Sequence, residues 1–306
     1  MTRPCGMKET SRDQQMTRNY ALFLGCYIPS MQPFAEASLR RIAPLLKMKL
    51  IDMEGATCCP VPEIVRLVDY DAWLYVSARN LALAESEGED ILALCNGCWE
   101  TLHEAREAIV SDPELLTEVN SHLSLFDKRL EGKIKVKHFL EVIVEDVGLQ
   151  SLKASIKKPL SNLKVGVQYG CKLYKSPESK FVTYFDNIIE TLGVKAIEYG
   201  AEKLCCGFPL SLYSLDEAME ERAKFKLAKM QEAKVDCLVT ACPGCFDVLE
   251  KAQLLLKRQD LHYEIPMLSL TELMALSLGF RPQEIGVDKH RVKTDALIAK
   301  LGMVGN

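Results

Sequence analysis

Ten cysteines of this chain fall into two sets of five with the same internal order. Each set has a single cysteine, then an adjacent pair, then a C-x-x-C motif. Adjacent cysteines rarely bridge each other, because a relaxed disulfide prefers Cα atoms roughly 5.5 Å apart. Thiolate ligation of metal is the chemistry that suits such sets. The candidate ligands are Cys26, Cys58, Cys59, Cys95 and Cys98 in the first set, and Cys171, Cys205, Cys206, Cys242 and Cys245 in the second.

The spacing inside the two sets agrees closely. The first set reads C-x31-CC-x35-CxxC, and the second reads C-x33-CC-x35-CxxC. An interval of about 35 residues suits one passage from strand through helix to the next strand. The chain is therefore expected to be a tandem duplication of one unit.

Composition limits the class of protein. The chain has 306 residues, 12 cysteines and a formal net charge of −4, which is unlike the basic footprint of a nucleic-acid binder. No apolar run approaches the roughly 18 residues that a membrane helix needs, and the polar start lacks the centre of a signal peptide. We expect a cytoplasmic chain with reduced thiols and a flexible tail over residues 1–19.

Short apolar runs alternate with amphipathic segments in both halves. This pattern predicts an α/β fold of two duplicated Rossmann-like βαβ units with mainly parallel sheets, divided into residues 20–155 and 156–306. Ligands gather beyond the carboxyl ends of such strands, where every cysteine group falls. The expected strands are 20–26, 49–59, 90–98, 163–171, 195–206 and 235–245, and the expected helices are 31–48, 69–88, 99–110, 179–193, 214–234 and 246–259.

The number of thiols limits the kind of metal centre. A structural zinc and an ordinary cubane cluster each need four ligands, whereas each half offers five. The surplus fits a cluster with an extra or bridging ligand better than it fits zinc. Helix N-termini after each C-x-x-C motif would stabilise the negative charge of a sulfur-rich centre.

The two cysteine patterns resemble the cysteine-rich CCG domain. Two such domains in about 300 residues are similar to the B subunit of heterodisulfide reductase from methanogenic archaea. The resemblance covers residues 20 to 280. It implies one noncubane [4Fe–4S] cluster in each domain, held by the five cysteines of that half, which act in catalysis through the clusters. It also implies that the mixed disulfide of coenzyme M and coenzyme B is the substrate.

The same resemblance implies partners for electron delivery. They are the flavin-containing and the ferredoxin-like subunits of heterodisulfide reductase, with a hydrogenase or formate dehydrogenase module as a further partner. The chain departs from the CCG pattern at Pro60, which stands where the first motif would have glycine. Because some relatives carry zinc at one site, we expect any zinc in the half that bears Pro60.

Two other functions remain open. One is the CCG subunit of a different oxidoreductase, of the thiol:fumarate reductase, succinate, glycolate or glycerol-3-phosphate dehydrogenase type. The other is a non-catalytic zinc scaffold that anchors a membrane or electron-transfer partner. The chain lacks ferredoxin-type C-x2-C-x2-C-x3-C runs, which favours a stand-alone subunit.

Several remaining residues have simpler interpretations. Cys237 lies inside an apolar run and is expected to be an inert buried thiol. Cys5 is interpreted as incidental, and His138 as structural. Lys172 and Lys175 could meet an anionic coenzyme, but a solvated pair is the favoured interpretation.

Overall fold

The computed structural model describes residues 17–175 and 180–303, and it confirms the duplicated α/β fold. Two four-stranded sheets have equivalent orders, β2-β1-β3-β4 and β6-β5-β7-β8, and every strand pair is parallel. The strands are β1 (Arg18–Phe23), β2 (Met48–Asp52), β3 (Ile91–Ala93), β4 (Val136–His138), β5 (Lys164–Gln168), β6 (Lys195–Ala196), β7 (Cys237–Thr240) and β8 (Met267–Ser269).

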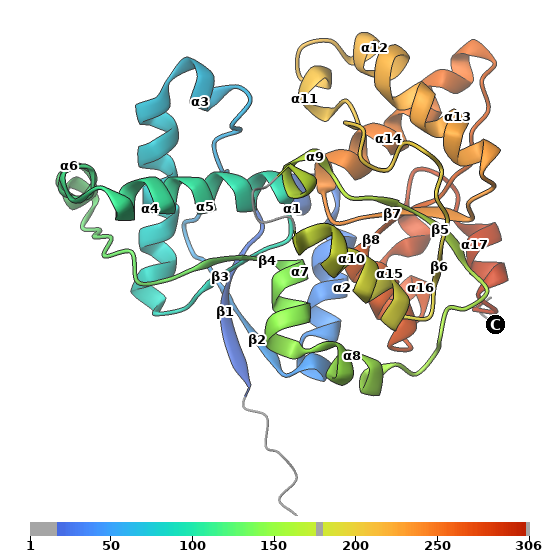
Figure 1. The fold of residues 1–306 in the computed structure, drawn as a ribbon, viewed down its shortest axis with the longest axis horizontal. Helices are drawn as coiled ribbons and strands as arrows, with labels where there is room; N and C mark the ends of the chain where they lie inside the picture. Colours follow the sequence, from blue (N-terminus) through green and yellow to red (C-terminus); the bar gives the residue numbers. More distant parts are fainter. Residues whose placement is uncertain (1–16, 176–179, 304–306) are drawn as a thin grey trace, which may run out of the picture.

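Helices follow the strands in both halves (Figure 1). Side-chain caps begin several of them, as when Asp69 accepts from the backbone N–H of Ala72, because an oxygen there satisfies an otherwise unpaired donor. In the described part of the chain, none combines the length and apolar character needed to cross a bilayer. The α-helices are α1 (Tyr27–Met31), α2 (Pro33–Ile42), α3 (Val65–Val68), α4 (Tyr70–Glu87), α5 (Asn96–Ser111), α6 (Pro113–Leu123), α7 (Phe139–Glu141), α8 (Leu149–Ser155), α9 (Cys171–Tyr174), α10 (Lys180–Thr191), α11 (Phe208–Ser211), α12 (Leu215–Ala218), α13 (Lys224–Glu232), α14 (Pro243–Leu256), α15 (Leu270–Ser277), α16 (Pro282–Ile285) and α17 (Asp295–Lys300).

The strands before the cysteine pairs are shorter than the sequence predicts. β2 ends at Asp52 and β6 is only two residues long, so irregular loops carry each chain to its pair. Gly55 and Gly200 have positive φ in these loops, a conformation that glycine adopts without strain. The loops turn the pairs across the carboxyl edge of each sheet, which a straight strand would overshoot.

Several helix predictions are also modified. The helix predicted over 31–48 divides into α2 and a short 3-10 turn before Met48 opens β2, and α14 begins at Pro243, ahead of the predicted 246. α5 begins at Asn96, so Cys98 lies inside its first turn. The segment predicted as a helix over 214–234 contains a π-helical stretch, Met219–Ala223, between α12 and α13. The π-helical stretch lies beside the second cysteine pair, where Arg222 approaches Gly207, and π-bulges tend to occur at functional positions.

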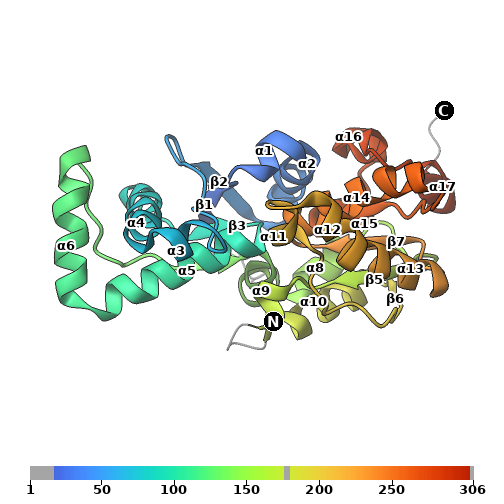
Figure 2. The same cartoon turned by 90° about the horizontal axis from the view of Figure 1, so that it is seen from above.

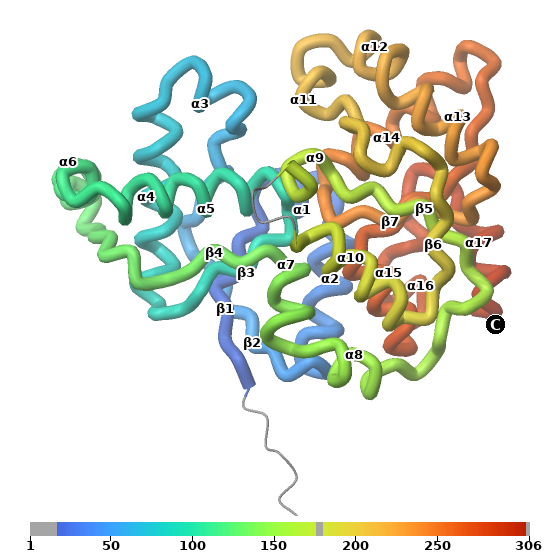
Figure 3. The backbone as a smooth tube through the Cα atoms, in the orientation of Figure 1, coloured from blue at the N-terminus to red at the C-terminus, as the bar shows by residue number. Residues whose placement is uncertain are grey.

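The larger of two hydrophobic clusters spans both halves, and the smaller one lies within the C-terminal half. α2 of the first half packs against α15 of the second, and α10 of the second packs against α7 and α8 of the first. Figure 1 and the tube in Figure 3 show α2 lying among the helices of the C-terminal half. Leu39 and Leu273 are fully buried members of the same cluster. Figure 2 shows α6 at one end of the molecule and α17 at the other, with the helices of the two halves meeting in between.

A buried ion pair lies where the halves interlock. His290 Nε2 is 2.7 Å from Glu272 Oε1 with both side chains inaccessible, and the ring centroid of Phe34 is 4.3 Å from that of the imidazole. Burial pushes the pKa of His290 down, but the Glu272 carboxylate prevails and holds it above the ordinary 6.5. A raised folded-state pKa stabilises the fold below the unfolded pKa, and this stabilisation is lost as pH rises through the folded value.

We therefore expect the melting temperature to fall as pH rises above about 6.5, the ordinary pKa of histidine. A scan of melting temperature from pH 6 to pH 9 tests this, with a His290→Gln variant as the control. Glutamine retains an N–H donor and does not titrate, so its profile should be flatter. Parallel profiles for the two proteins would contradict this role for His290.

Candidate metal centre

The fold brings the cysteine groups to the carboxyl ends of their strands, as predicted. Cys26 follows β1 and precedes α1, and Cys171 opens α9 after β5. Cys95 and Cys242 are the N-cap residues of α5 and α14, which come directly after β3 and β7. The pairs arrive on the loops after β2 and β6.

The ten sulfurs form one continuous series of contacts. In the first half Cys58 Sγ lies 3.3 Å from Cys26 Sγ, and Cys59 Sγ lies 3.1 Å from Cys98 Sγ. The equivalent thiols of the second half make equivalent contacts, Cys171 with Cys205 and Cys206 with Cys245. The two series meet where Cys95 contacts Cys242. From one end to the other, the joined series of contacts runs through Cys26, Cys58, Cys59, Cys98, Cys95, Cys242, Cys245, Cys206, Cys205 and Cys171.

A cavity of about 130 Å³ lies between the halves and is lined by eight of the ten cysteines, all except Cys58 and Cys205. Its other walls are mainly apolar: Leu24, Tyr27 and Val61 come from the first half, and Phe208, Pro209 and Leu212 from the second. An apolar wall strengthens electrostatic interactions inside the cavity because it keeps water out. The cavity therefore joins both cysteine sets in one sheltered space.

The contacts between thiols lower the pKa of three of the ten cysteines and raise that of the other seven. The thiols of Cys58 and Cys98 lower the pKa of Cys59 to about 5. Those of Cys245 and Cys95 hold the pKa of Cys242 well below its usual range. The thiolate is the form of cysteine that binds metal. Each half thus contains a candidate ligand whose thiol pKa is lowered by neighbouring thiols.

The donor set fits a sulfur-rich metal centre. Among the described residues, no three or more Cys, His, Asp or Glu side chains already surround a single point as metal ligands, so the fit rests on donor chemistry. Five thiols in each half converge at the start of a long helix, whose first backbone N–H groups favour negative charge. Soft thiolates select iron–sulfur clusters or zinc over hard cations.

Backbone geometry holds the first set close together. Gly25 has a φ of +63°, and a Cβ atom at this position would lie 2.7 Å from Cys98 Sγ. No side chain fits between this turn and the C-x-x-C motif. The glycine therefore sets how closely the Cys26 loop approaches α5.

Two amides that the sequence did not single out tie the halves together around the cavity. Asn96 donates through Nδ2 to the Tyr169 carbonyl oxygen at 3.0 Å, and its Oδ1 lies 3.1 Å from His138 Nε2. Gln32 is 2% exposed and donates to the Pro243 carbonyl oxygen at 2.6 Å. Each amide of the first half thus fixes a cysteine loop of the second. The only signal in the sequence was the position of Asn96 inside a C-x-x-C motif.

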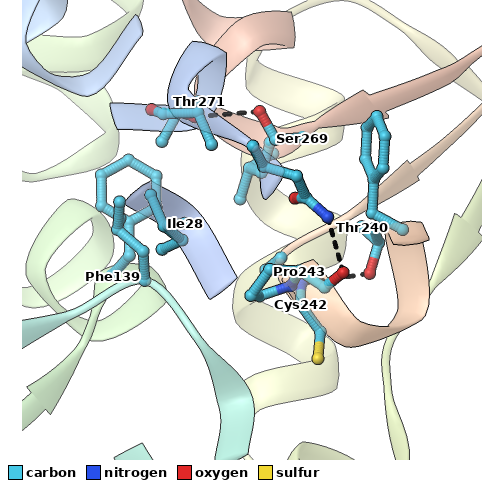
Figure 4. Close-up of a pocket in the computed structure, with 13 residues that line it drawn as sticks. Ile28, Phe139, Thr240, Cys242, Pro243, Ser269 and Thr271 are labelled. Carbon is cyan, nitrogen blue, oxygen red and sulfur yellow. Dashed lines mark hydrogen bonds between the residues drawn. The ribbon is translucent and has the colours of Figure 1, made fainter. Parts of the chain in front are cut away.

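Behind Cys242 lies a second, smaller cavity of about 20 Å³ (Figure 4). Ser269 and Thr271 lie on its far side, with their hydroxyl oxygens 3.0 Å apart, and the sulfur of Cys242 points away from both. Thr240 Oγ1 accepts from the Cys242 backbone N–H at 3.2 Å. This region therefore supports the Cys242 loop from behind, while the thiol faces the larger cavity.

The structure decides most of the simpler interpretations. Cys237 is fully buried on β7, where burial raises the pKa of its thiol, so the prediction of an inert thiol is confirmed. His138 is confirmed as structural, because it caps α7 and burial lowers its pKa to about 3. Cys5 lies outside the described residues.

The prediction of a solvated lysine pair is wrong for Lys172. Its Nζ lies 2.6 Å from both Glu63 and Glu100, and its side chain is 20% exposed. Lys172 and Glu63 both line the cavity. The cation therefore bridges the halves, because the interface brings two first-half carboxylates to the start of α9. Lys175 is exposed, as expected.

Comparisons with known proteins agree with this geometry. The model of the CCG cysteine-rich domain family matches residues 20–103 and 165–250. The chain is 34% identical over 289 residues to the B subunit of the ferredoxin/F420H2-dependent CoB-CoM heterodisulfide reductase of Methanosarcina acetivorans, covering 92% of this chain and 96% of the relative. It is 38% identical over 279 residues to an Archaeoglobus profundus protein described as like the heterodisulfide reductase B subunit, covering 87% and 92%.

A relative of another kind also aligns along nearly the whole chain. The 8-methylmenaquinol:fumarate reductase membrane anchor subunit of Wolinella succinogenes is 30% identical, covering 92% of this chain and all of the relative. Among solved structures, a hypothetical protein from Helicobacter pylori has a TM-score of 0.74 at 18% identity. That match covers 94% of this chain and 55% of the solved chain, and it supports the fold alone.

Proposed function

The chain belongs to the family of cysteine-rich CCG-domain proteins, and we propose that it is the disulfide-cleaving subunit of a heterodisulfide reductase. The relatives named as B subunits of that enzyme support this assignment, since they align over most of both chains. The proposed substrate is the mixed disulfide of coenzyme M and coenzyme B, and the proposed ligands are the ten cysteines of the two sets.

The convergence of both cysteine sets on one cavity carries this proposal. Cys95 and Cys242 touch across the interface, and eight of the ten thiols line the same space. Two independent structural metal sites would have no need of such contact. Two equivalent centres that face each other suit a reaction that breaks one bond between two like atoms, because each centre can receive one of the released sulfurs.

The overall reaction is R–S–S–R′ + 2 e⁻ + 2 H⁺ → RSH + R′SH. Bound noncubane [4Fe–4S] clusters would supply one-electron transfer and Lewis acidity toward the released sulfurs. The residues of the chain provide the surroundings of the reaction. The apolar walls exclude water, and the N-termini of α5 and α14 favour negative charge where thiolates are released.

The electrons must come from a partner chain. No G-x-G-x-x-G run for a flavin or nicotinamide cofactor occurs in the sequence. The flavin-containing and the ferredoxin-like subunits of heterodisulfide reductase are the partners we propose. Lys172 contributes a cation to the cavity wall, but Glu63 and Glu100 already pair with it.

A second candidate function comes from the Wolinella relative. That protein aligns with this chain along its whole length, and its name describes the membrane anchor subunit of a fumarate reductase. In that case the cysteine sets would pass electrons between partners without cleaving a disulfide. Turnover of the mixed disulfide, which only the first function predicts, separates the two.

Metal content and spectroscopy of anaerobically purified protein test the proposal. We expect about eight iron and eight sulfide per chain, with an EPR signal that appears when coenzyme thiol is added under oxidation. About four iron with one zinc would restrict the redox chemistry to one half, expected to be the half without Pro60. Zinc alone would refute the enzyme and leave the scaffold function.

A further inference from the structure

The two cysteine sets are alike in sequence, but their surroundings differ in charge. We propose that the buried ammonium group of Lys226 raises the reduction potential of the C-terminal centre above that of the N-terminal one. An electron that enters the chain would then rest in the C-terminal half first. This inference deepens the proposed function and rests on the presence of a redox cluster in each half.

Lys226 holds the loop that carries the second cysteine pair. It lies on α13 and is 1% exposed. Its Nζ donates to the carbonyl oxygens of Ala201 and of Leu204, the latter at 3.0 Å, and lies 5.6 Å from the ring centroid of Tyr199. Since Leu204 precedes Cys205 directly, the ammonium is anchored immediately beside the pair.

The positive charge of Lys226 has no direct carboxylate partner. Among the described residues, no Asp or Glu oxygen lies within ion-pair distance of its Nζ. Burial lowers the pKa of Lys226 to about 8, whereas the thiols of Cys245 and Cys206 and the more weakly acting Glu202 carboxylate oppose that effect. A buried cation is costly unless compensating charge is near. A sulfur-rich anionic centre at the second set would add to the negative charge that Glu202 supplies.

The equivalent position of the first half lacks a buried charge. Lys226 comes 20 residues after Cys206, and Arg79 comes 20 residues after Cys59. Arg79 donates through Nη1 to the Gly55 carbonyl oxygen at 2.9 Å, in an exposed part of the loop. The segment next to the first pair is held instead by the neutral amide of Asn80, whose Oδ1 accepts from the Thr57 backbone N–H at 3.0 Å.

A second cation, Arg222, lies four residues before Lys226 and adds to the difference in charge between the two cysteine sets. Arg222 lies against Gly207, since its Cβ would be 3.0 Å from a Cβ placed at that glycine. Its charge helps to lower the pKa of Cys205, after the larger effects of the Cys171 and Cys206 thiols. The equivalent residue of the first half is the uncharged Tyr75, whose hydroxyl donates to Glu118 at 2.7 Å.

These contacts set the direction of the effect. Positive charge in a low-dielectric site favours the more negative, reduced form of a cluster. Lys226 acts on the second set from a buried position, and Arg222 adds a weaker effect from an exposed one. Among the described residues, no cation equivalent to Lys226 is buried beside the first set. The C-terminal centre should therefore be the easier one to reduce.

A redox titration followed by EPR tests this on the full chain, with iron measured in every sample. Lys226→Met should lower the midpoint potential of the C-terminal centre. At a fixed potential, the ratio of its reduced to its oxidised form should then fall by roughly tenfold. Lys226→Arg should keep the potential near that of the unaltered protein. Arg79→Met, the matched control, should leave that centre unchanged.

The outcomes separate this inference from the proposed function. Unaltered protein without iron would overturn the function. Full iron with the same potential in Lys226→Met, or an equal shift in Arg79→Met, would overturn only the inference. If Lys226→Met fails to fold or load iron, the exposed Arg222→Gln variant decides instead: a smaller shift in the same direction supports the inference, and no shift refutes it.

Discussion

Cys245→Ser is expected to lower the bound iron by about half and the rate of disulfide reduction by about 100-fold or more. Loss of a residue that only supports a metal ligand already costs roughly 10–100-fold in metal affinity or activity. Cys245 is 4% exposed and lies in the first turn of α14. Its thiol contacts Cys206 and Cys242, and Cys242 is the residue that meets the first set. Serine lacks the soft sulfur that iron prefers, and it leaves the adjoining thiolates without their neighbour.

The matched control for this variant is Cys237→Ser. Cys237 is also buried and lies eight residues earlier in the chain, but it does not line the cavity. The change places a hydroxyl in an apolar strand, so a loss of stability of about 1–3 kcal/mol is expected. Iron, sulfide and turnover per folded molecule should not change. Equal iron loss in the two variants would mean that Cys245 is not a ligand.

The cysteine intervals alone predicted where the site would form. Equal spacing of about one strand–helix–strand passage placed each group at the carboxyl edge of a parallel sheet, and the structure puts eight thiols around one cavity there. The pattern repeats because each half must deliver the same five residues to the same edge. Local sequence was therefore enough to predict three of the four strands of each half, but not the edge strands β4 and β8.

The contacts between the halves could not be predicted in the same way. α2 packs on the second half and α10 on the first, although each follows a strand of its own half. An amphipathic helix shows which of its faces is buried, but not which partner covers that face. The hydrogen bonds of Asn96 and Gln32 escaped prediction for a similar reason. Each is a single polar residue whose partner, a backbone carbonyl of the other half, leaves no trace in the local pattern.

The irregular loops before the cysteine pairs were the other failure of prediction. Apolar residues such as Ile51 and Ile197 suggested strands that continue to Cys59 and Cys206. The chain instead leaves the sheet at Asp52 and Ala196. Ligation of metal requires thiols to converge on a point, whereas a strand would direct successive side chains to opposite faces. The loops instead let both thiols of the first pair reach other cysteines, Cys58 at Cys26 and Cys59 at Cys98.

A substitution at Gly170, in the interface between the halves, is expected to have the second large effect, a loss of stability. This residue has a φ of +82° and lies directly before Cys171. A Cβ there would collide with Asn96 Nδ2 and would lie 3.8 Å from the Cβ of Cys242. Gly170→Ala should therefore displace Asn96, break its bond to the Tyr169 carbonyl oxygen, and loosen both cysteine loops at once. We expect the free energy of unfolding to fall by about 3 kcal/mol. The loss combines a backbone conformation of φ +82° and ψ 134°, which is strained for residues other than glycine, with the lost hydrogen bond.

Gly200→Ala isolates the backbone part of that loss. Gly200 has a φ of +78°, but a Cβ there would meet nothing within 4 Å, so only the conformational cost of about 1–2 kcal/mol applies. Urea unfolding of both variants gives the difference, and iron content shows whether the loops still hold metal. A double-mutant cycle with Asn96→Ala then tests the cause. If Asn96 is what the new methyl group strikes, removing it should recover part of the loss, whereas strictly additive losses would rule out that collision and place the effect in the backbone alone.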